Sequence, residues 1–150
     1  RVFITTDFVT FTEKIADRQY IMKYIKNYVL FFTIVSIIIL VGSYLFASEI
    51  LSIFGEEYMM YSDSFFILII GIIGIFLLRG VYGNLLASIG RIEVNYYIIS
   101  IALIINIISN QYLIPIYGIK GAAITSAILM WFTGILSWLC FAYLYKKKYR

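Results

Sequence analysis

The chain has 150 residues, of which 63% are hydrophobic and 13% are charged, and its net charge is +4. A soluble domain carries about 25% charged residues, so this composition excludes a soluble globular fold and predicts a membrane protein. The basic residues flank apolar runs and form no stripe with interleaved aromatic residues, so we expect no nucleic-acid partner.

The first segment has an amphipathic pattern. Over residues 11–27, approximately, apolar side chains recur at intervals of three, four and seven, which is typical of an amphipathic helix. Thr10 and Glu13 have the spacing of a capping box. The same segment contains the basic residues Lys14, Arg18, Lys23 and Lys26. We predict a cytoplasmic helix that lies on the inner membrane surface or joins two bundles, with a dedicated partner site as the alternative.

Four apolar stretches follow, each long enough to cross a bilayer core of about 30 Å at roughly 1.5 Å per residue. They cover residues 28–47, 64–89, 94–114 and 121–145. The connections between them are too short for independent domains. We therefore predict an all-α membrane protein in which four antiparallel transmembrane helices form part of a larger two-bundle transporter.

The distribution of Lys and Arg predicts the orientation of these helices. Basic residues precede the first stretch, Arg91 lies between the second and third, and residues 146–150 are almost all basic, so these regions should face the cytoplasm. The connections at 48–63 and 115–120 carry acidic residues or Lys120 alone, and they should face outward. Both ends of the chain are thus predicted to be cytoplasmic.

Arg79 interrupts the second stretch, and no acidic residue occurs in any of the four. A charged side chain inside the membrane costs at least about 2.5 kcal/mol and normally faces protein or water with a partner. That partner lies elsewhere in the protein or is an anionic ligand, and phosphate suits a planar guanidinium. Alternatively, the crossing covers residues 58–78 and Arg79 extends to the inner headgroups.

Small and polar residues mark the helix surfaces that pack against each other. The second stretch carries Gly71, Gly74, Gly80, Gly83 and Asn84, and the third carries Asn95, Ala102, Asn106, Ser109 and Asn110 at helical spacing. We expect the polar stripe of the third helix to face protein or water, as packing contacts or as a cavity wall. Pro115 should end that helix near residue 114, and Gly118 and Gly121 should turn the chain into a fourth helix that begins with small residues.

Catalytic and metal-binding constellations are nearly absent from the sequence. It contains no histidine, one cysteine and no Walker-type phosphate loop. A histidine-dependent nucleophile, a thiolate cluster and ATP hydrolysis are therefore not encoded here. We expect neither an enzyme nor a metal or cofactor site.

Three segments resemble one protein family. They are IFGEEY at 53–58, NLLASIGR at 84–91 and LIPIYGIKGAAITSAI at 113–128. Together they resemble the C-terminal part of prokaryotic polysaccharide biosynthesis flippases, the Wzx-like members of the multidrug, oligosaccharidyl-lipid and polysaccharide exporter superfamily. The resemblance extends from about residue 11 to the basic tail. Since that family has 12 or 14 spans, it implies that the chain is the last four, with N-terminal helices of the same protein missing.

The resemblance implies alternating-access transport of a polyprenyl-pyrophosphate-linked oligosaccharide from the cytoplasmic to the outer leaflet of a prokaryotic cell membrane, for cell-surface polysaccharide biosynthesis. Lipid-linked oligosaccharide and membrane lipid would be its partners. Arg79 would face the pyrophosphate, and Asn84, Asn106 and Asn110 would contact sugar or headgroup. One alternative is a drug or cation exporter of the same superfamily, which should favour buried acids. The other is a structural or assembly subunit of a membrane complex.

Overall fold

The computed structural model describes residues 14–149, and these residues are almost wholly helical. The elements are α2 (Arg18–Ser52), the 3-10 helix η1 (Glu56–Tyr61), α3 (Ser62–Gly74), the π-helix η2 (Ile75–Arg79), α4 (Gly80–Ser88), α5 (Ile92–Tyr117) and α6 (Ile119–Lys148). Four runs are long and apolar enough to cross a membrane: α2, Glu56–Ser88, α5 and α6. The prediction of an all-α membrane protein is confirmed.

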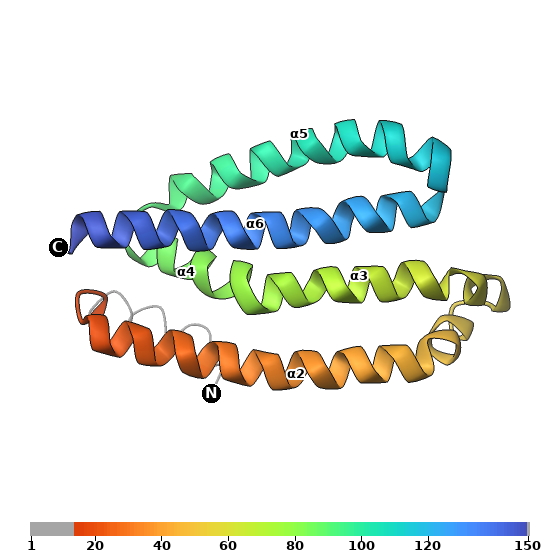
Figure 1. The fold of residues 1–150 in the computed structure, drawn as a ribbon, viewed down its shortest axis with the longest axis horizontal. Helices are drawn as coiled ribbons and strands as arrows, with labels where there is room; N and C mark the ends of the chain where they lie inside the picture. Colours follow the sequence, from red (N-terminus) through yellow and green to blue (C-terminus); the bar gives the residue numbers. More distant parts are fainter. Residues whose placement is uncertain (1–13, 150) are drawn as a thin grey trace.

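Helix α6 occupies the centre of the arrangement (Figure 1). It packs against α3, η2, α4 and α5, whereas α2 packs mainly against η1, α3 and η2. In Figure 1 the chain reverses direction at each connection, so that sequential runs lie side by side. The run from α3 to α4 and helix α6 therefore form the inner pair, and α2 and α5 flank it.

Helix α2 begins at Arg18, and its N-cap is Asp17. The Asp17 carboxylate accepts hydrogen bonds from the backbone N–H groups of Gln19 and Tyr20, at 2.9 and 3.1 Å. Residues 15–17 of the predicted amphipathic segment form a turn and the N-cap. From Arg18 on, the segment continues into the first span as one helix, with a kink at Phe46. The capping box predicted at Thr10 and Glu13 lies outside the described residues.

The second run is not the uniform helix that the sequence predicts. Five residues, Ile75–Arg79, form a π-helix between α3 and α4, and the N–H of Gly80 donates to the carbonyl of Ile75. One extra residue in a helical turn shifts the faces of α3 and α4 relative to each other. Such π-turns are rare and occur frequently at functional sites. Here the π-turn ends on Arg79, the basic residue of this run.

The prediction that Pro115 ends the third helix near residue 114 is wrong. Helix α5 includes Pro115 and ends at Tyr117, because a missing N–H in the last turn removes only one hydrogen bond. Gly118 ends the helix, with φ of 58° and its N–H donating to the carbonyl of Ile114 at 2.8 Å. Helix α6 begins directly afterwards, so Gly118 alone forms the turn.

Small residues allow the inner pair to pack closely, as predicted. A Cβ added at Gly71 would lie 2.7 Å from the Cα of Ala127, and one at Gly134 would lie 2.8 Å from the Cβ of Leu78. Further toward the C-terminal end of α6, the core contains larger apolar side chains. These are Ile15, Ile21, Val81, Tyr82, Leu85, Leu86, Ile89 and Phe141. Close packing and this core position α4 and α6 against each other around Arg79.

The two ends of the structure differ in charge. At one end Lys120 forms a 3.0 Å ion pair with Asp63, which joins the two connections predicted to face outward. At the other end Lys148 Nζ donates to the Ile89 carbonyl at 2.9 Å, and the basic regions of the chain gather there. The structure thus places the basic regions at one end and the two connections predicted to face outward at the other, the same grouping that the charge pattern predicts. Which end is cytoplasmic stays a prediction.

Candidate functional site

The guanidinium of Arg79 joins three helical runs. Its Nη1 donates to Asn95 Oδ1 on α5 at 2.6 Å and to Ser137 Oγ on α6 at 2.8 Å. Among residues 14–149 it forms no ion pair. The charge predicted to need a partner is therefore held by neutral oxygens, which bind it without neutralising it.

Both acceptors are oriented by hydrogen bonds of their own. Asn95 Nδ2 donates to the carbonyl of Gly83 at 2.9 Å, which turns Oδ1 toward Arg79. Ser137 Oγ donates its proton to the carbonyl of Thr133 at 2.7 Å, so only its lone pairs remain for Arg79. The two oxygens around the guanidinium are therefore held as acceptors by other protein groups and need no ligand to orient them.

Gly83 leaves the space that the guanidinium occupies. It lies one turn after Arg79, and a Cβ added there would lie 3.0 Å from Arg79 Nη1. The arginine side chain consequently extends along α4 toward the end of the molecule that carries the basic residues. The glycine thus has a steric role in the site.

The position of Arg79 along its helical run fits both interpretations given above, a residue that faces protein or a ligand and one that extends toward the headgroups. The 33-residue run is about 50 Å long and exceeds a core of roughly 30 Å by about 10 Å at each end when centred. Arg79 precedes Ser88 by nine residues, or about 14 Å, so a centred run would place its backbone just inside the core. Its side chain points toward the nearer surface, yet Asn95 and Ser137 hold it within the protein.

A shallow, largely open groove of about 400 Å³, called the Arg79 cavity below, lies between η2, α5 and α6, next to Arg79. This volume is within the range of about 300–1,000 Å³ that ligand sites usually have. Its lining residues are Ile75, Arg79, Ile99, Ala102, Leu103, Asn106, Ser126, Leu129, Met130 and Thr133. The wall is mostly apolar, with polar groups on each helix and no acidic residue among those ten.

The structure brings three of the four predicted site residues together. Arg79 and Asn106 line the same cavity. Asn110 lies one turn beyond, where its Nδ2 donates to Asn106 Oδ1 at 3.1 Å, and its own Oδ1 is buried with no hydrogen-bond partner among residues 14–149. Asn84 is exposed on α4 and does not line this cavity.

Two residues that complete the site were missed in the sequence. Thr133 and Ser137 lie four residues apart in α6, the spacing that places side chains on one helix face. That spacing, in a stretch otherwise rich in Leu, Phe and Trp, was the available signal. No pattern in the sequence indicated the π-turn that positions Arg79.

The guanidinium retains capacity for a ligand. Of its five N–H donors, two at Nη1 are used by Asn95 and Ser137, and the other three make no hydrogen bond to the described residues. Phosphate and carboxylate oxygens match such a planar donor set. The guanidinium therefore has unused donors that suit an anionic group.

The fold and this cavity define a multi-pass α-helical membrane protein. Comparisons with models of protein families, with curated proteins and with solved structures find no match. The resemblance to polysaccharide flippases therefore stays a prediction from the sequence. The functional inference depends on the chemistry around Arg79.

Proposed function

We propose that the protein transports a lipid-linked oligosaccharide across the membrane and that Arg79 binds the pyrophosphate of this substrate. The observation that carries the proposal is the Arg79 guanidinium beside an apolar cavity, with three N–H donors unused by the described residues. A polyprenyl-pyrophosphate glycan combines a long hydrocarbon with an anionic group. That combination matches an apolar wall next to a guanidinium.

Asn106 and Asn110 extend the polar part of the site along α5. Their side chains are linked by the 3.1 Å hydrogen bond, and the buried Oδ1 of Asn110 has an acceptor position that the described residues leave unused. A hydroxyl or headgroup donor reaches this oxygen only when the side chains that cover it move. We assign them to the sugar or headgroup. We further propose that the protein lies in a prokaryotic cell membrane with both ends of the chain cytoplasmic. It moves the substrate from the cytoplasmic to the outer leaflet by rocking against a second helical bundle.

A structural or assembly role is the competing proposal, because the bonds from Arg79 to Asn95 and Ser137 join three helical runs. In that case Arg79 stabilises packing and contacts no substrate. A drug or cation exporter is disfavoured, since a cationic substrate needs an acidic partner and the lining of this cavity contains none.

The experiment compares Arg79→Ala, Arg79→Lys and Ser137→Ala in cells that depend on the protein for surface polysaccharide. Polysaccharide and the amount of folded protein are both measured. We expect Arg79→Ala to abolish export while protein persists, Arg79→Lys to retain part of it, and Ser137→Ala to remain near normal. Normal polysaccharide in Arg79→Ala contradicts the proposal. Parallel loss of folded protein in Arg79→Ala and Ser137→Ala supports the structural role.

A further inference from the structure

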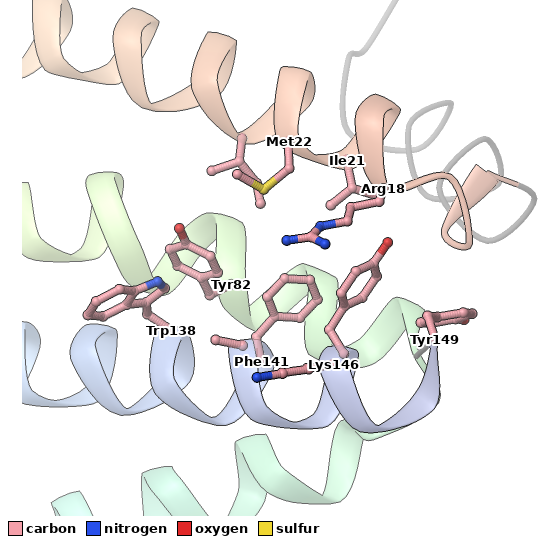
Figure 2. A pocket seen from close by; sticks show the side chains of 11 residues that line it. Arg18, Ile21, Met22, Tyr82, Trp138, Phe141, Lys146 and Tyr149 are labelled. Atoms are coloured by element: carbon pink, nitrogen blue, oxygen red, sulfur yellow. The ribbon is translucent and has the colours of Figure 1, made fainter.

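A second cavity lies between α2, α4 and α6 (Figure 2). Its volume is about 430 Å³, and it is enclosed by the first turns of α2, by α4 and by the last turns of α6. The residues that determine its chemistry are Arg18, Met22, Tyr82, Trp138, Phe141 and Lys146. It shares no lining residue with the cavity beside Arg79.

Two cations from different helices line this cavity. Figure 2 shows the Arg18 guanidinium pointing from α2 toward α6, where Lys146 is located. Among residues 14–149, no acidic residue lines the cavity and neither cation forms an ion pair. The nearest acid in sequence, Asp17, has its carboxylate bonded to the N–H groups that begin α2. The positive charge of the cavity is therefore not neutralised by these residues.

The cations lie at the level expected for lipid phosphates. Helix α6 has 30 residues, so it is about 45 Å long and exceeds a bilayer core of roughly 30 Å by about 15 Å. Lys146 is in its last turn, and Arg18 is the first residue of the still longer α2. Trp138 precedes Lys146 by two turns and lies deeper. The cavity is thus cationic at its outer edge and apolar and aromatic toward the core.

We propose that this cavity binds an anionic phospholipid of the surrounding membrane, with its phosphate between Arg18 and Lys146 and one acyl chain along Met22 and Trp138. Arginine binds phosphate oxygens in pairs, and aromatic side chains are favoured at this depth. The lipid stays bound and is not transported, so the inference goes beyond the proposed function and does not depend on it. The chemistry recognised is a phosphate ester on a long hydrocarbon chain.

Trp138 provides a local reporter, because the chain has two tryptophans and Trp131→Phe leaves it as the only one. The protein is reconstituted in phosphatidylcholine vesicles that contain phosphatidylglycerol, with bromine on the acyl chains of one lipid or the other. Bromine quenches tryptophan on contact, so the ratio of the two quenching curves gives the lipid preference at Trp138. Trp138→Phe, with Trp131 as reporter, measures lipid elsewhere on the surface.

We expect Trp138 to prefer phosphatidylglycerol, by up to about fivefold for each cation at the surface. In the double variant Arg18→Gln with Lys146→Gln, the ratio of the two quenching curves should fall close to one. The matched control, Lys23→Gln with Lys147→Gln, removes the same charge from the same end but changes no lining residue, and should keep the preference. Gel filtration and circular dichroism establish that each variant is folded.

Three results overturn the proposal. One is equal quenching by both brominated lipids in the unaltered cavity. Another is an equal loss of preference in the control variant, which indicates surface charge alone. The third is displacement of the lipid by a competitor. Displacement by millimolar inorganic phosphate indicates a free-anion site, and displacement by polyprenyl phosphate at a tenfold lower mole fraction than phosphatidylglycerol indicates a substrate site. Failure of this test leaves the assignment of Arg79 unaffected, because the two cavities share no lining residue.

Discussion

The inner pair of helical runs and the two flanking helices differ in how they bury their surface. In the most apolar windows, 28% of residues are buried in Glu56–Ser88 and in α6, against 11% in α2 and 6% in α5. The inner pair carries glycine and alanine where the helices meet, while α2 exposes large side chains such as Phe31 and Ile38. In a membrane, small residues thus mark protein contacts, and large apolar ones mark surfaces that lipid or other helices cover.

The largest expected effect comes from filling the closest contact of the inner pair. In Gly134→Leu the Cβ alone would lie 2.8 Å from Leu78 Cβ and 3.1 Å from the carbonyl oxygen of Gly74. The larger side chain therefore forces α6 to move away. We expect several kcal/mol of destabilisation, above the roughly 1–3 kcal/mol usual for overpacking, because the obstacle includes backbone. Thermal unfolding in detergent measures it.

Gly42→Leu is the matched control, since no atom of the described part of the chain lies within 4 Å of a Cβ at that position in α2. It should change the unfolding temperature little. Equal destabilisation by the two variants would remove the distinction between inner and flanking helices.

A smaller effect is expected where the inner pair holds the Arg79 guanidinium. In Gly83→Ala the new methyl would lie 3.0 Å from Arg79 Nη1, so the bonds to Asn95 and Ser137 must lengthen or break. We expect a loss of about 1–3 kcal/mol, the usual cost of disturbing hydrogen bonds to a charged group. In the Arg79→Ala background, Gly83→Ala should cost almost nothing. Additive losses in this double-mutant cycle would show that the glycine serves another contact.

The smallest effect is expected at the opposite end, where the Lys120–Asp63 ion pair joins the first turns of α6 and α3. Its side chains are 49% and 79% exposed, so solvent screens the attraction. Lys120→Ala should lower stability by less than about 1 kcal/mol, and added salt should reduce the difference further. A loss as large as that of Gly83→Ala would indicate that this end contributes to packing and not merely to surface charge.

Composition and span length were sufficient to predict the fold class, because about 20 apolar residues in succession have few other structures available. The grouping of connections by charge also agrees with the structure. The end of α5 was mispredicted, since the effect of Pro115 depends on how many hydrogen bonds follow it. The partners of Arg79 were not predictable from local patterns, because Asn95 and Ser137 lie 16 and 58 residues away in the sequence.

The central claim is that the Arg79 guanidinium binds the anionic group of a membrane substrate. Equilibrium binding of a short-chain polyprenyl-pyrophosphate-linked sugar to the purified protein tests it most directly, with Arg79→Gln compared against Lys120→Gln as a charge-matched control. Charge-assisted hydrogen bonds contribute about 1.5–3 kcal/mol, so we predict a Kd roughly 10- to 100-fold higher for Arg79→Gln and unchanged for Lys120→Gln. An unchanged Kd in a folded Arg79→Gln protein would contradict the account.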